Sequence, residues 1–391
     1  MAVTRTQVVI VGAGPAGSLL SHLLSRAGIA HVLLEHRSRA QVLARIRAGV
    51  IEAHSAAILR EAGLATRLDA QGFVHEGCAL AYAGRRFRVD FAALAGAPVI
   101  IYGQTELQRD LYAALDAAGA TFLDEVDGVQ LHDLTTGTPS VTFQRAGESH
   151  RVACDYVVGC DGYHGVSRAA IPPASLRTFE RVYPFGWLGI LSETPPVDEE
   201  LIYANHARGF ALCSMRNPNL SRYYVQCPLD TTVDAWPDAR FWDELKARLP
   251  DDVAERLVTG PSIEKSIAPL RSFVAEPLRY GQLFLAGDAA HIVPPTGAKG
   301  LNLAISDVTA LGRALARHYR DGDDHGLDTY SETALRRVWR AVRFSWWMTT
   351  LLHRFPDDGA FGQRIQETEL GLLEESEHAR RGLANQYVGN F

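Results

Sequence analysis

The sequence contains few cysteines, no excess of positive charge and no long uninterrupted apolar segment. Its five cysteines are scattered without a C-x-x-C pair, which is typical of buried thiols in a reducing cytoplasm. Lys and Arg number 39 against 45 Asp and Glu, which argues against nucleic acid as the main partner. No apolar run approaches about 18 residues, so no segment is expected to span a membrane. Internal repeats and low-complexity linkers are also absent, and 391 residues with 47% hydrophobic content allow a large core and two domains.

A glycine-rich loop near the N-terminus lies between an apolar strand, predicted over Thr6–Val11, and a helix predicted over Ser18–Ala27. The loop reads Gly12-Ala13-Gly14-Pro15-Ala16-Gly17, and a second predicted strand, His31–Leu34, ends in Glu35. Glycines at this spacing allow a tight turn and a close approach of a pyrophosphate to the helix start, and the acid can bind ribose hydroxyls. The pattern therefore predicts dinucleotide binding, without separating FAD from NAD.

A second loop of this kind lies near the other end of the chain, where the apolar segment Leu283–Ala286 breaks at Gly287-Asp288. Prolines and glycines force an irregular path up to a helix predicted over Leu301–His318. Unpaired backbone N–H groups and the positive end of the helix suit an anion. Asp288 suits a hydroxyl-bearing group such as a ribityl chain.

From residue 182 to 227 the pattern changes to antiparallel strands without crossover helices. Alternation places Tyr203 on one strand face, Ser214 and Arg216 on the next, and Arg222 and Tyr224 on the third. If these faces point inward, they supply the few polar groups of a small apolar pocket, and a buried arginine requires an anion such as a substrate carboxylate. The alternative is a half-exposed sheet with solvated arginines.

Several other features have an ordinary structural explanation when each is considered alone. Arg45 and Arg47, just before a helix predicted over Ile51–Ala62, either face solvent or brace phosphates. Asp161-Gly162 is common at plain turns after a strand. His75 is an ordinary strand-edge histidine by this reasoning. The aromatic helix around Trp346-Trp347 is typical of core or of a subunit contact.

Three motifs together resemble the FAD-dependent aromatic hydroxylases, the group A flavoprotein monooxygenases. They are Gly12-x-Gly14-x-x-Gly17, Cys160-Asp161-Gly162, and Gly287-Asp288 with its loop, and the similarity runs nearly end to end. The resemblance implies a mixed α/β fold: a Rossmann-like FAD-binding domain with a parallel sheet over residues 1–178, and an antiparallel-sheet substrate domain over 179–277. The remainder, 278–391, would complete the FAD site and supply C-terminal helices.

The resemblance also implies which residues bind cofactors. Glu35 would hold the adenosine ribose. The rest of FAD would be held by Arg45, Arg47, Gln104, Asp288 and the backbone of Leu301 and Asn302. The full FAD set is Gly12, Gly14, Gly17, Glu35, Arg45, Ile46, Arg47, Ala48, Gly49, Val50, Gln104, Asp161, Gly287, Asp288 and the backbone of Leu301 and Asn302. NADPH or NADH would be the co-substrate, with Arg37, Arg39, His164 and Arg168 as candidate contacts. His36 and Gln41 stand where the family commonly has arginine and tyrosine, so the preference between the two stays open.

For the substrate, the resemblance implies 4-hydroxybenzoate, hydroxylated by O2 through a flavin hydroperoxide to 3,4-dihydroxybenzoate. Ser214, Arg216 and Tyr224 would bind the carboxylate, with Met215 beside them. Tyr203 would hydrogen-bond the phenol. The remaining expected roles are Tyr387 and His75 in a proton relay, the Pro295 carbonyl against the 4-hydroxyl, and Lys299 and Arg222 as positive charges near the flavin, Arg222 also assisting its movement.

Three alternatives differ in chemistry. A related hydroxylase would act on 4-aminobenzoate or a dihydroxybenzoate, because an arginine that binds a carboxylate says little about the para substituent. A flavin oxidoreductase would release NAD(P)+ without an oxygenated product. A non-catalytic FAD-fold protein would have no use for Tyr203 and Tyr387. We further expect a cytoplasmic protein and a homodimer, with the Trp346-Trp347 helix as a candidate dimer face.

Overall fold

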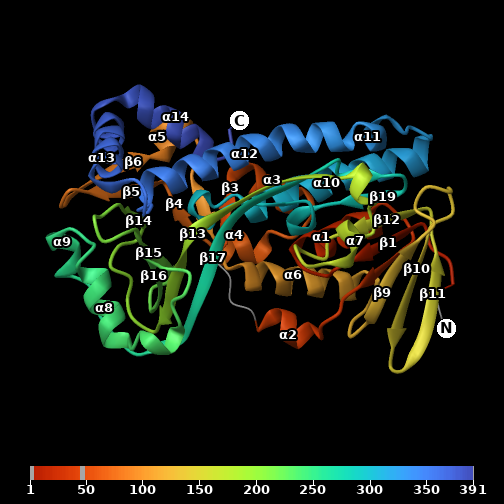
Figure 1. Ribbon diagram of the computed structural model, residues 1–391. Coiled ribbons are helices and arrows are strands. Elements are labelled where there is room, and N and C mark those ends of the chain that lie inside the picture. Colours follow the sequence, from red (N-terminus) through yellow and green to blue (C-terminus); the bar gives the residue numbers. More distant parts are fainter. Residues whose placement is uncertain (1–3, 45–48, 391) are drawn as a thin grey trace.

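The computed structural model describes residues 4–44 and 49–390 of the chain. One end of the molecule holds a six-stranded sheet in the order β18-β19-β12-β1-β2-β8, parallel except for β18 (Figure 1). Its central strands are buried on both faces, as expected for an all-apolar parallel strand. The bounds are β1 Val8–Val11, β2 His31–Leu34, β8 Thr121–Leu123, β12 Tyr156–Gly159, β18 Arg279–Tyr280 and β19 Leu283–Leu285.

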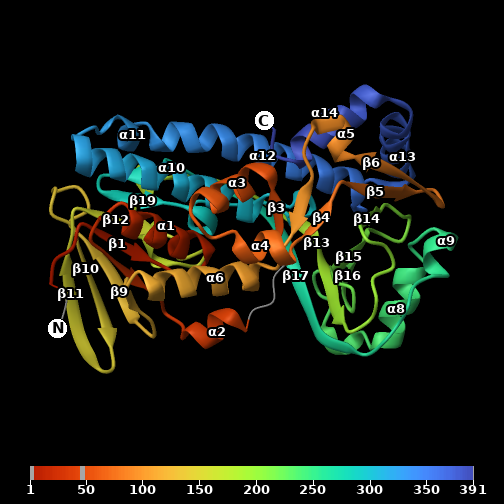
Figure 2. The same cartoon turned by 180° about the vertical axis from the view of Figure 1, so that it is seen from behind.

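Three long helices pack together beside this sheet. α1 (Pro15–Arg26) contacts both α6 (Gln104–Ala117) and α10 (Gly300–Asp321). Short helices complete this part of the molecule: α2 Arg39–Leu43, α3 Ala53–Glu61, α4 Thr66–Gln71 and α7 Val166–Ala169 (Figure 2). A separate antiparallel sheet of β9 (Asp127–His132), β10 (Ser140–Arg145) and β11 (Glu148–Ala153) lies at the end of the molecule near the N-terminus (Figure 1).

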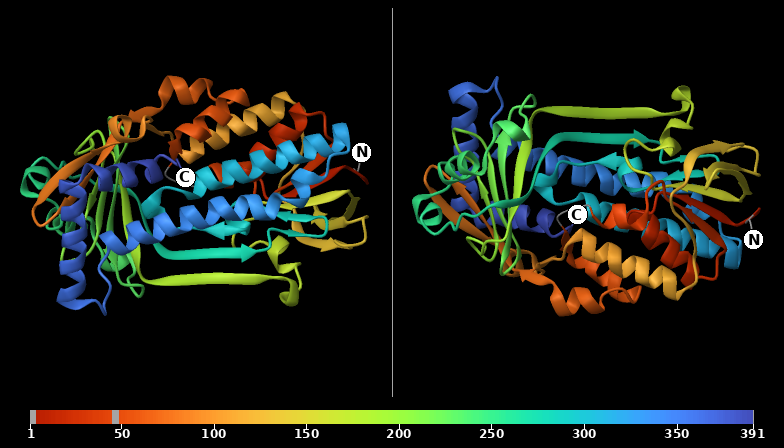
Figure 3. Two further views of the ribbon diagram at one scale, coloured as in Figure 1. Left: turned by 90° about the horizontal axis from the view of Figure 1, so that it is seen from above. Right: turned by 90° about the horizontal axis from the view of Figure 1, so that it is seen from below.

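The other end of the molecule is built on an eight-stranded sheet in the order β20-β17-β13-β16-β15-β14-β5-β6. Its neighbours are antiparallel except for β14 and β5, which run parallel. Two long strands, β13 and β17, extend from this sheet towards the nucleotide-binding end (Figure 3). The bounds are β5 Gly77–Tyr82, β6 Arg85–Asp90, β13 Arg177–Ser192, β14 Leu201–Ala204, β15 Ala211–Asn217, β16 Leu220–Cys227, β17 Ser262–Glu276 and β20 His291–Ile292.

The alternation predicted for the antiparallel strands is confirmed by the two cores on either side of this sheet. One face packs with the C-terminal helices α12 (Tyr330–Leu352), α13 (Gly359–Glu375) and α14 (Glu377–Tyr387), and it carries Tyr203 and Leu212. The other face, with Ile202 and Cys213, packs against α8 (Asp238–Lys246) and α9 (Asp251–Ala254). The face that carries the predicted polar residues is therefore the one enclosed by the C-terminal helices.

A fourth, small sheet joins β3 (Val50–Glu52), β7 (Val99–Ile101) and β4 (Phe73–His75), next to α5 (Phe91–Ala95). The helix predicted to start at Ile51 is wrong at its beginning, because Ile51 and Glu52 pair with Ile100 and Val99 before α3 starts. The boundaries at residues 178 and 277 stay a prediction, and strand pairing crosses the first of them through β5 and β6. Among the described helices, including α11 (His325–Asp328), none is both long and apolar enough to cross a membrane.

Candidate active site

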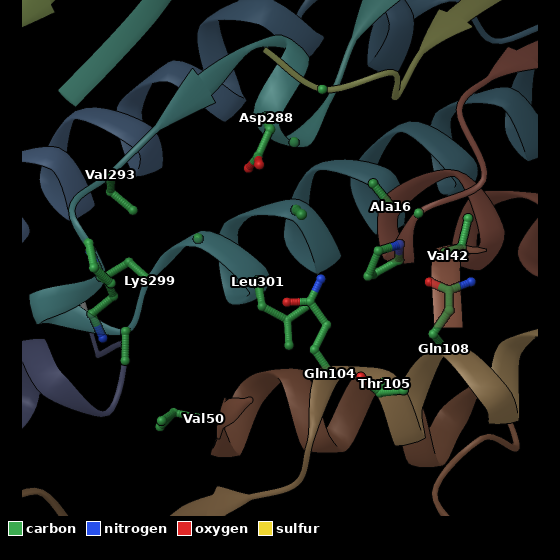
Figure 4. A pocket seen from close by; sticks show the side chains of 18 of the residues that line it. Ala16, Val42, Val50, Gln104, Thr105, Gln108, Asp288, Val293, Lys299 and Leu301 are labelled. Carbon is green, nitrogen blue, oxygen red and sulfur yellow. The ribbon is translucent and has the colours of Figure 1, made fainter. Parts of the chain in front are cut away.

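A single cavity of about 440 Å³ joins the two ends of the molecule. Its nucleotide end is lined by both glycine-rich loops, and its other end by the eight-stranded sheet. Figure 4 shows Asp288, Leu301 and Gln104 around the nucleotide end, with Val50 and Lys299 further along. The lining contains Gly12, Gly14, Glu35, Arg37, Val50, Gln104, Asp161, Gly287, Asp288, Lys299, Leu301, Tyr203, Ser214, Arg216, Tyr224 and Pro295 among the residues singled out by sequence.

The first loop needs glycine for steric reasons. Gly12 has φ +98°, and a Cβ there would lie 2.4 Å from the Cys160 carbonyl oxygen. A Cβ at Gly17 would lie 1.9 Å from the carbonyl oxygen of Gly12. The helix that follows begins without a side-chain cap, so its first N–H groups are available to an anion. Glu35 is oriented towards the loop, since its Oε2 accepts a hydrogen bond from the Ala13 N–H at 2.7 Å.

Three side chains that were not identified from the sequence hold this loop by hydrogen bonds to one carbonyl. The Ala13 carbonyl accepts hydrogen bonds from Ser18 Oγ (2.9 Å), Gln108 Nε2 (3.2 Å) and the Tyr112 hydroxyl (3.1 Å). Gln104, Gln108 and Tyr112 stand at successive four-residue intervals on α6, which places them on one helix face. That interval was the available signal for the two missed α6 residues.

The second loop is held by a buried ion pair. Asp307 Oδ2, from α10, accepts hydrogen bonds from the Gly287 N–H at 3.0 Å and from His291 Nε2 at 2.6 Å. Burial lowers the pKa of His291, but the adjacent Asp307 carboxylate outweighs it and raises the pKa above its ordinary value. The contacts fix both sides of Asp288, whose side chain reaches into the cavity (Figure 4).

The start of α10 has backbone N–H groups that no side chain caps. The Asn302 side chain is engaged elsewhere, because its Nδ2 donates to the carbonyls of Val50 (2.9 Å) and Ala298 (3.0 Å) and its Oδ1 accepts from the Glu52 N–H. No side chain caps this helix, so the N–H groups of its first turn are left for a ligand. The role of the Leu301 and Asn302 backbone in binding FAD stays a prediction.

The remaining expected FAD residues differ in how much the structure says of them. Arg45, Ile46, Arg47 and Ala48 lie outside the described residues. Gly49 packs closely on the strand before α6, since a Cβ there would lie 1.8 Å from the Tyr102 carbonyl oxygen. Asp161 borders the cavity, but its Oδ2 already accepts from the Ser167 N–H and Oγ, both at 2.9 Å, at the start of α7. Burial raises the pKa of Asp161.

The four nicotinamide candidates do not gather at the cavity. Arg37 borders it, whereas Arg39 pairs with Asp116 at 2.7 Å and stacks over an aromatic ring. Arg168 donates a hydrogen bond to the Ala289 carbonyl at 2.9 Å, and His164 is exposed. A role of these residues in binding NADPH or NADH stays a prediction.

The substrate end of the cavity brings together Tyr203, Ser214, Arg216 and Tyr224 from neighbouring strands. Ser214 is buried, and the Arg216 Nε has no hydrogen-bond partner within the described part of the chain. Burial lowers the pKa of Arg216, because a desolvated cation is disfavoured until an anion joins it. Met215, between them in sequence, is buried outside the lining of the cavity.

Tyr203 and Tyr387 form a buried pair of phenols. The Tyr203 and Tyr387 hydroxyl oxygens are 2.7 Å apart, and Tyr387 stacks on Phe91. Burial raises the pKa of both tyrosines, so both are protonated and each has one proton to donate. His75 is buried as well, and burial lowers its pKa to about 4. Its two ring nitrogens have no hydrogen-bond partner among the described residues, so its place in a relay stays a prediction.

The two expected cations are both paired. Lys299 Nζ, fully buried, contacts Glu52 Oε1 at 2.7 Å and donates to the Tyr387 carbonyl at 2.6 Å. Burial lowers the pKa of Lys299, against the effect of Glu52. Arg337 lies 3.8 Å from the other Glu52 oxygen, so two cations share one carboxylate. Arg222 pairs with Glu264 at 3.0 Å and lies over the Tyr224 ring.

One wall residue of the cavity, Trp187 on β13, had no role assigned from sequence. Its ring lies 5.0 Å from those of Phe210 and Tyr224, between the sheet and the C-terminal helices. The sequence offers no periodic signal for it, because its partners come from distant segments.

Comparison with known proteins agrees with this geometry. Residues 5–345 match the family described as FAD binding domain. The chain is 53% identical over 390 residues to p-hydroxybenzoate hydroxylase of Acinetobacter baylyi, covering 100% of this chain and 96% of that protein. A 3-(3-hydroxy-phenyl)propionate/3-hydroxycinnamic acid hydroxylase of a Mycobacterium species is 26% identical over 337 residues, which are 84% of this chain and 57% of that protein.

Solved structures with low sequence identity share the fold. The p-nitrophenol 4-monooxygenase PnpA of Pseudomonas putida superposes with a TM-score of 0.83 at 18% identity, with both chains covered in full. The chain belongs to the FAD-binding-domain family of flavoproteins, as a member of the group of aromatic hydroxylases that includes p-hydroxybenzoate hydroxylase.

Proposed function

We propose that this protein is a flavin-dependent monooxygenase that converts 4-hydroxybenzoate to 3,4-dihydroxybenzoate. In the overall reaction NAD(P)H, a proton and O2 are consumed, one oxygen atom enters the ring and the other leaves as water. The observation that carries the proposal is that Arg216 and Tyr203, the latter hydrogen-bonded to Tyr387, line one cavity that also borders both nucleotide loops. The relative from Acinetobacter baylyi, p-hydroxybenzoate hydroxylase by name, supports the same substrate.

The residues that border the cavity fit FAD. The start of α1 has no side-chain cap and suits the pyrophosphate, which the glycine loop before it can approach closely. The start of α10 is also uncapped and leaves its first N–H groups to another part of FAD. Glu35 would hold the adenosine ribose, Asp288 the ribityl chain, and the backbone of Leu301 the flavin ring. Bound FAD would supply hydride acceptance from NAD(P)H and the transfer of one oxygen atom to the substrate.

The protein residues would orient and activate the aromatic ring. Arg216 pairs with the carboxylate, helped by Ser214 and Tyr224, which directs the phenol towards Tyr203. A phenol pKa is about 10, and a phenolate is the stronger carbon nucleophile at its ortho position. A hydrogen bond from Tyr203 favours the phenolate, and so does the net positive charge of Lys299 and Arg337 around the single Glu52 carboxylate.

The two tyrosines give the departing proton a route. Tyr203 can accept the substrate proton as it passes its own to Tyr387, since their oxygens lie within hydrogen-bond distance. Tyr387 would release its own proton in the same step towards His75, the proposed outer end of the relay. Because both hydroxyls are buried, the proton moves without opening the site to water, which protects the oxygen-transferring step.

The proposal is tested by measuring NADH and NADPH oxidation by the FAD-loaded protein with and without 4-hydroxybenzoate, with chromatographic assay of the product. We expect oxidation to rise with substrate and 3,4-dihydroxybenzoate to accumulate. Peroxide without product would support a related ring such as 4-aminobenzoate as the substrate. NAD(P)+ release that no aromatic acid stimulates would support a non-oxygenating oxidoreductase.

We also propose a homodimer in the cytoplasm. Large apolar side chains are exposed on two C-terminal helices: Trp346 on α12, and Phe361, Ile365 and Leu372 on α13. A second copy of this chain would cover them, as apolar interfaces do in homodimers. Sedimentation equilibrium would give twice the chain mass if this is right, and the 42.8 kDa of a single chain if it is wrong.

A further inference from the structure

The end of α12 stands directly behind the substrate end of the cavity. His353 caps this helix and is fully buried. Its ring stacks on Phe185 at 4.8 Å and on Phe210 at 4.3 Å. None of the expected catalytic or binding roles uses this histidine.

His353 is held as a neutral ring that accepts one hydrogen bond and donates another. Its Nδ1 lies 2.9 Å from the Thr349 carbonyl, which can only accept, so Nδ1 carries the proton. Its Nε2 then accepts the indole N–H of Trp187 at 2.6 Å. Burial lowers the pKa of His353 to about 3, which keeps this acceptor free of a proton at neutral pH.

This hydrogen bond determines which part of Trp187 the cavity meets. The indole N–H is directed to His353, so it is not available to a ligand. The ring lies 5.0 Å from that of Tyr224, which also lines the cavity, so only apolar indole surface is presented beside it. A wall of this kind suits an aromatic ring and offers nothing to a polar substituent.

The end of α12 also supports a second wall of the cavity, at the loop that carries Pro295. The Thr349 and Thr296 hydroxyl oxygens lie 3.0 Å apart, within hydrogen-bond distance, and Thr296 directly follows the cavity residue Pro295. A Cβ at Gly297 would lie 3.2 Å from the Ser345 Cα, so the loop sits directly on the helix. The end of α12 therefore contacts both Trp187 and the loop that carries Pro295.

We propose that His353 is a positioning residue: by accepting the Trp187 N–H it holds the indole as an apolar wall of the substrate site, on the turn of α12 that also carries the Pro295 loop. The inference rests on the proposed function, because it takes this end of the cavity as the place of the aromatic ring.

The test uses the FAD-loaded protein and the change in flavin absorbance on addition of 4-hydroxybenzoate. His353→Phe keeps a stacked ring and removes the acceptor, which leaves the indole N–H buried without a partner. We expect its Kd for 4-hydroxybenzoate to rise roughly tenfold, with FAD content unchanged. Trp187→Phe removes the donor of the same hydrogen bond. The Kd of the double variant, Trp187→Phe with His353→Phe, is therefore expected to differ from that of Trp187→Phe alone by less than about twofold.

The results of these titrations distinguish a failure of the His353 inference from a failure of the proposed function. If the wild-type protein binds 4-hydroxybenzoate and His353→Phe binds it equally well, or if the two substitutions add in full, the inference is overturned while the proposed function stands. If the wild-type protein does not bind 4-hydroxybenzoate, the proposed function fails and the inference fails with it. If His353→Phe does not fold, the inference is tested by hydrogen exchange of the Trp187 indole N–H in the wild-type holoenzyme. The signal of this N–H is assigned by its loss in Trp187→Phe. Slow hydrogen exchange supports the inference, and exchange at the rate of a solvent-exposed indole overturns it.

Discussion

Replacing Arg216 by alanine removes the cation around which the substrate end of the cavity is built. Arg216 lies beside Ser214 and Tyr224 in the lining, and its Nε has no hydrogen-bond partner among the described residues. Burial lowers its pKa, so a bound carboxylate would relieve an existing electrostatic penalty. A hydrogen bond to a charged group contributes about 1.5–3 kcal/mol, which corresponds to roughly a 10- to 150-fold rise in Kd on its loss.

The assay is a titration of the FAD-loaded variant with 4-hydroxybenzoate, followed by flavin absorbance. Two controls isolate the carboxylate contact. Phenol, which lacks the carboxylate, is expected to bind Arg216→Ala and the wild-type protein with similar weak affinity. Arg216→Lys keeps the charge but loses the bidentate geometry, and is expected to fall between the two. An unchanged Kd for 4-hydroxybenzoate in Arg216→Ala would refute the assignment of the carboxylate site.

Three further predictions concern Tyr203, Asp307 and His75. Tyr203→Phe removes the donor to the phenolate, so substrate-stimulated NAD(P)H oxidation should continue while 3,4-dihydroxybenzoate falls and peroxide rises; full coupling would contradict the activation role. Asp307→Asn weakens the contact with His291 and should raise the Kd for FAD by roughly tenfold, measured by titrating apoprotein; tight FAD binding would contradict its role in holding the loop. Burial lowers the pKa of His75 from 6.5 to about 4, so the unfolded chain binds this proton more readily than the folded one between these pH values. The free energy of unfolding should therefore be about 3 kcal/mol lower at pH 4 than above pH 6.5 through this group alone. Denaturant unfolding of His75→Gln should show a shallower pH dependence over that window, and an unchanged slope would count against it.

Local patterns predicted the elements of the fold well wherever the signal is short-range. The strand His31–Leu34 has the predicted bounds, because a short, mostly apolar run between turns leaves few alternatives. Alternation correctly placed Tyr203 and Leu212 on one face and Ile202 and Cys213 on the other. The beginning of the helix predicted at Ile51 was wrong because those residues pair with Ile100, and no local pattern reports such a distant partner.

The candidate site divides in the same way. Glycine loops and Glu35 were predicted from spacing alone, because phosphate binding imposes a local geometry. Tyr387 was assigned only through family resemblance, since it meets Tyr203 from 184 positions further along the chain. Trp187 and His353 are 166 positions apart, and neither residue type indicates the other. Contacts of this range become visible only when the sheet and the C-terminal helices are placed together.

The central claim is that this site transfers one atom of molecular oxygen to 4-hydroxybenzoate. The most direct measurement is a single incubation of the FAD-loaded protein with 4-hydroxybenzoate, NAD(P)H and 18O2, followed by mass spectrometry of the product and a count of NAD(P)H consumed. The account predicts 3,4-dihydroxybenzoate that carries one 18O atom, formed in nearly equal amount to the NAD(P)H oxidised. Product without 18O, or NAD(P)H oxidation that yields no hydroxylated ring with this substrate, would contradict it.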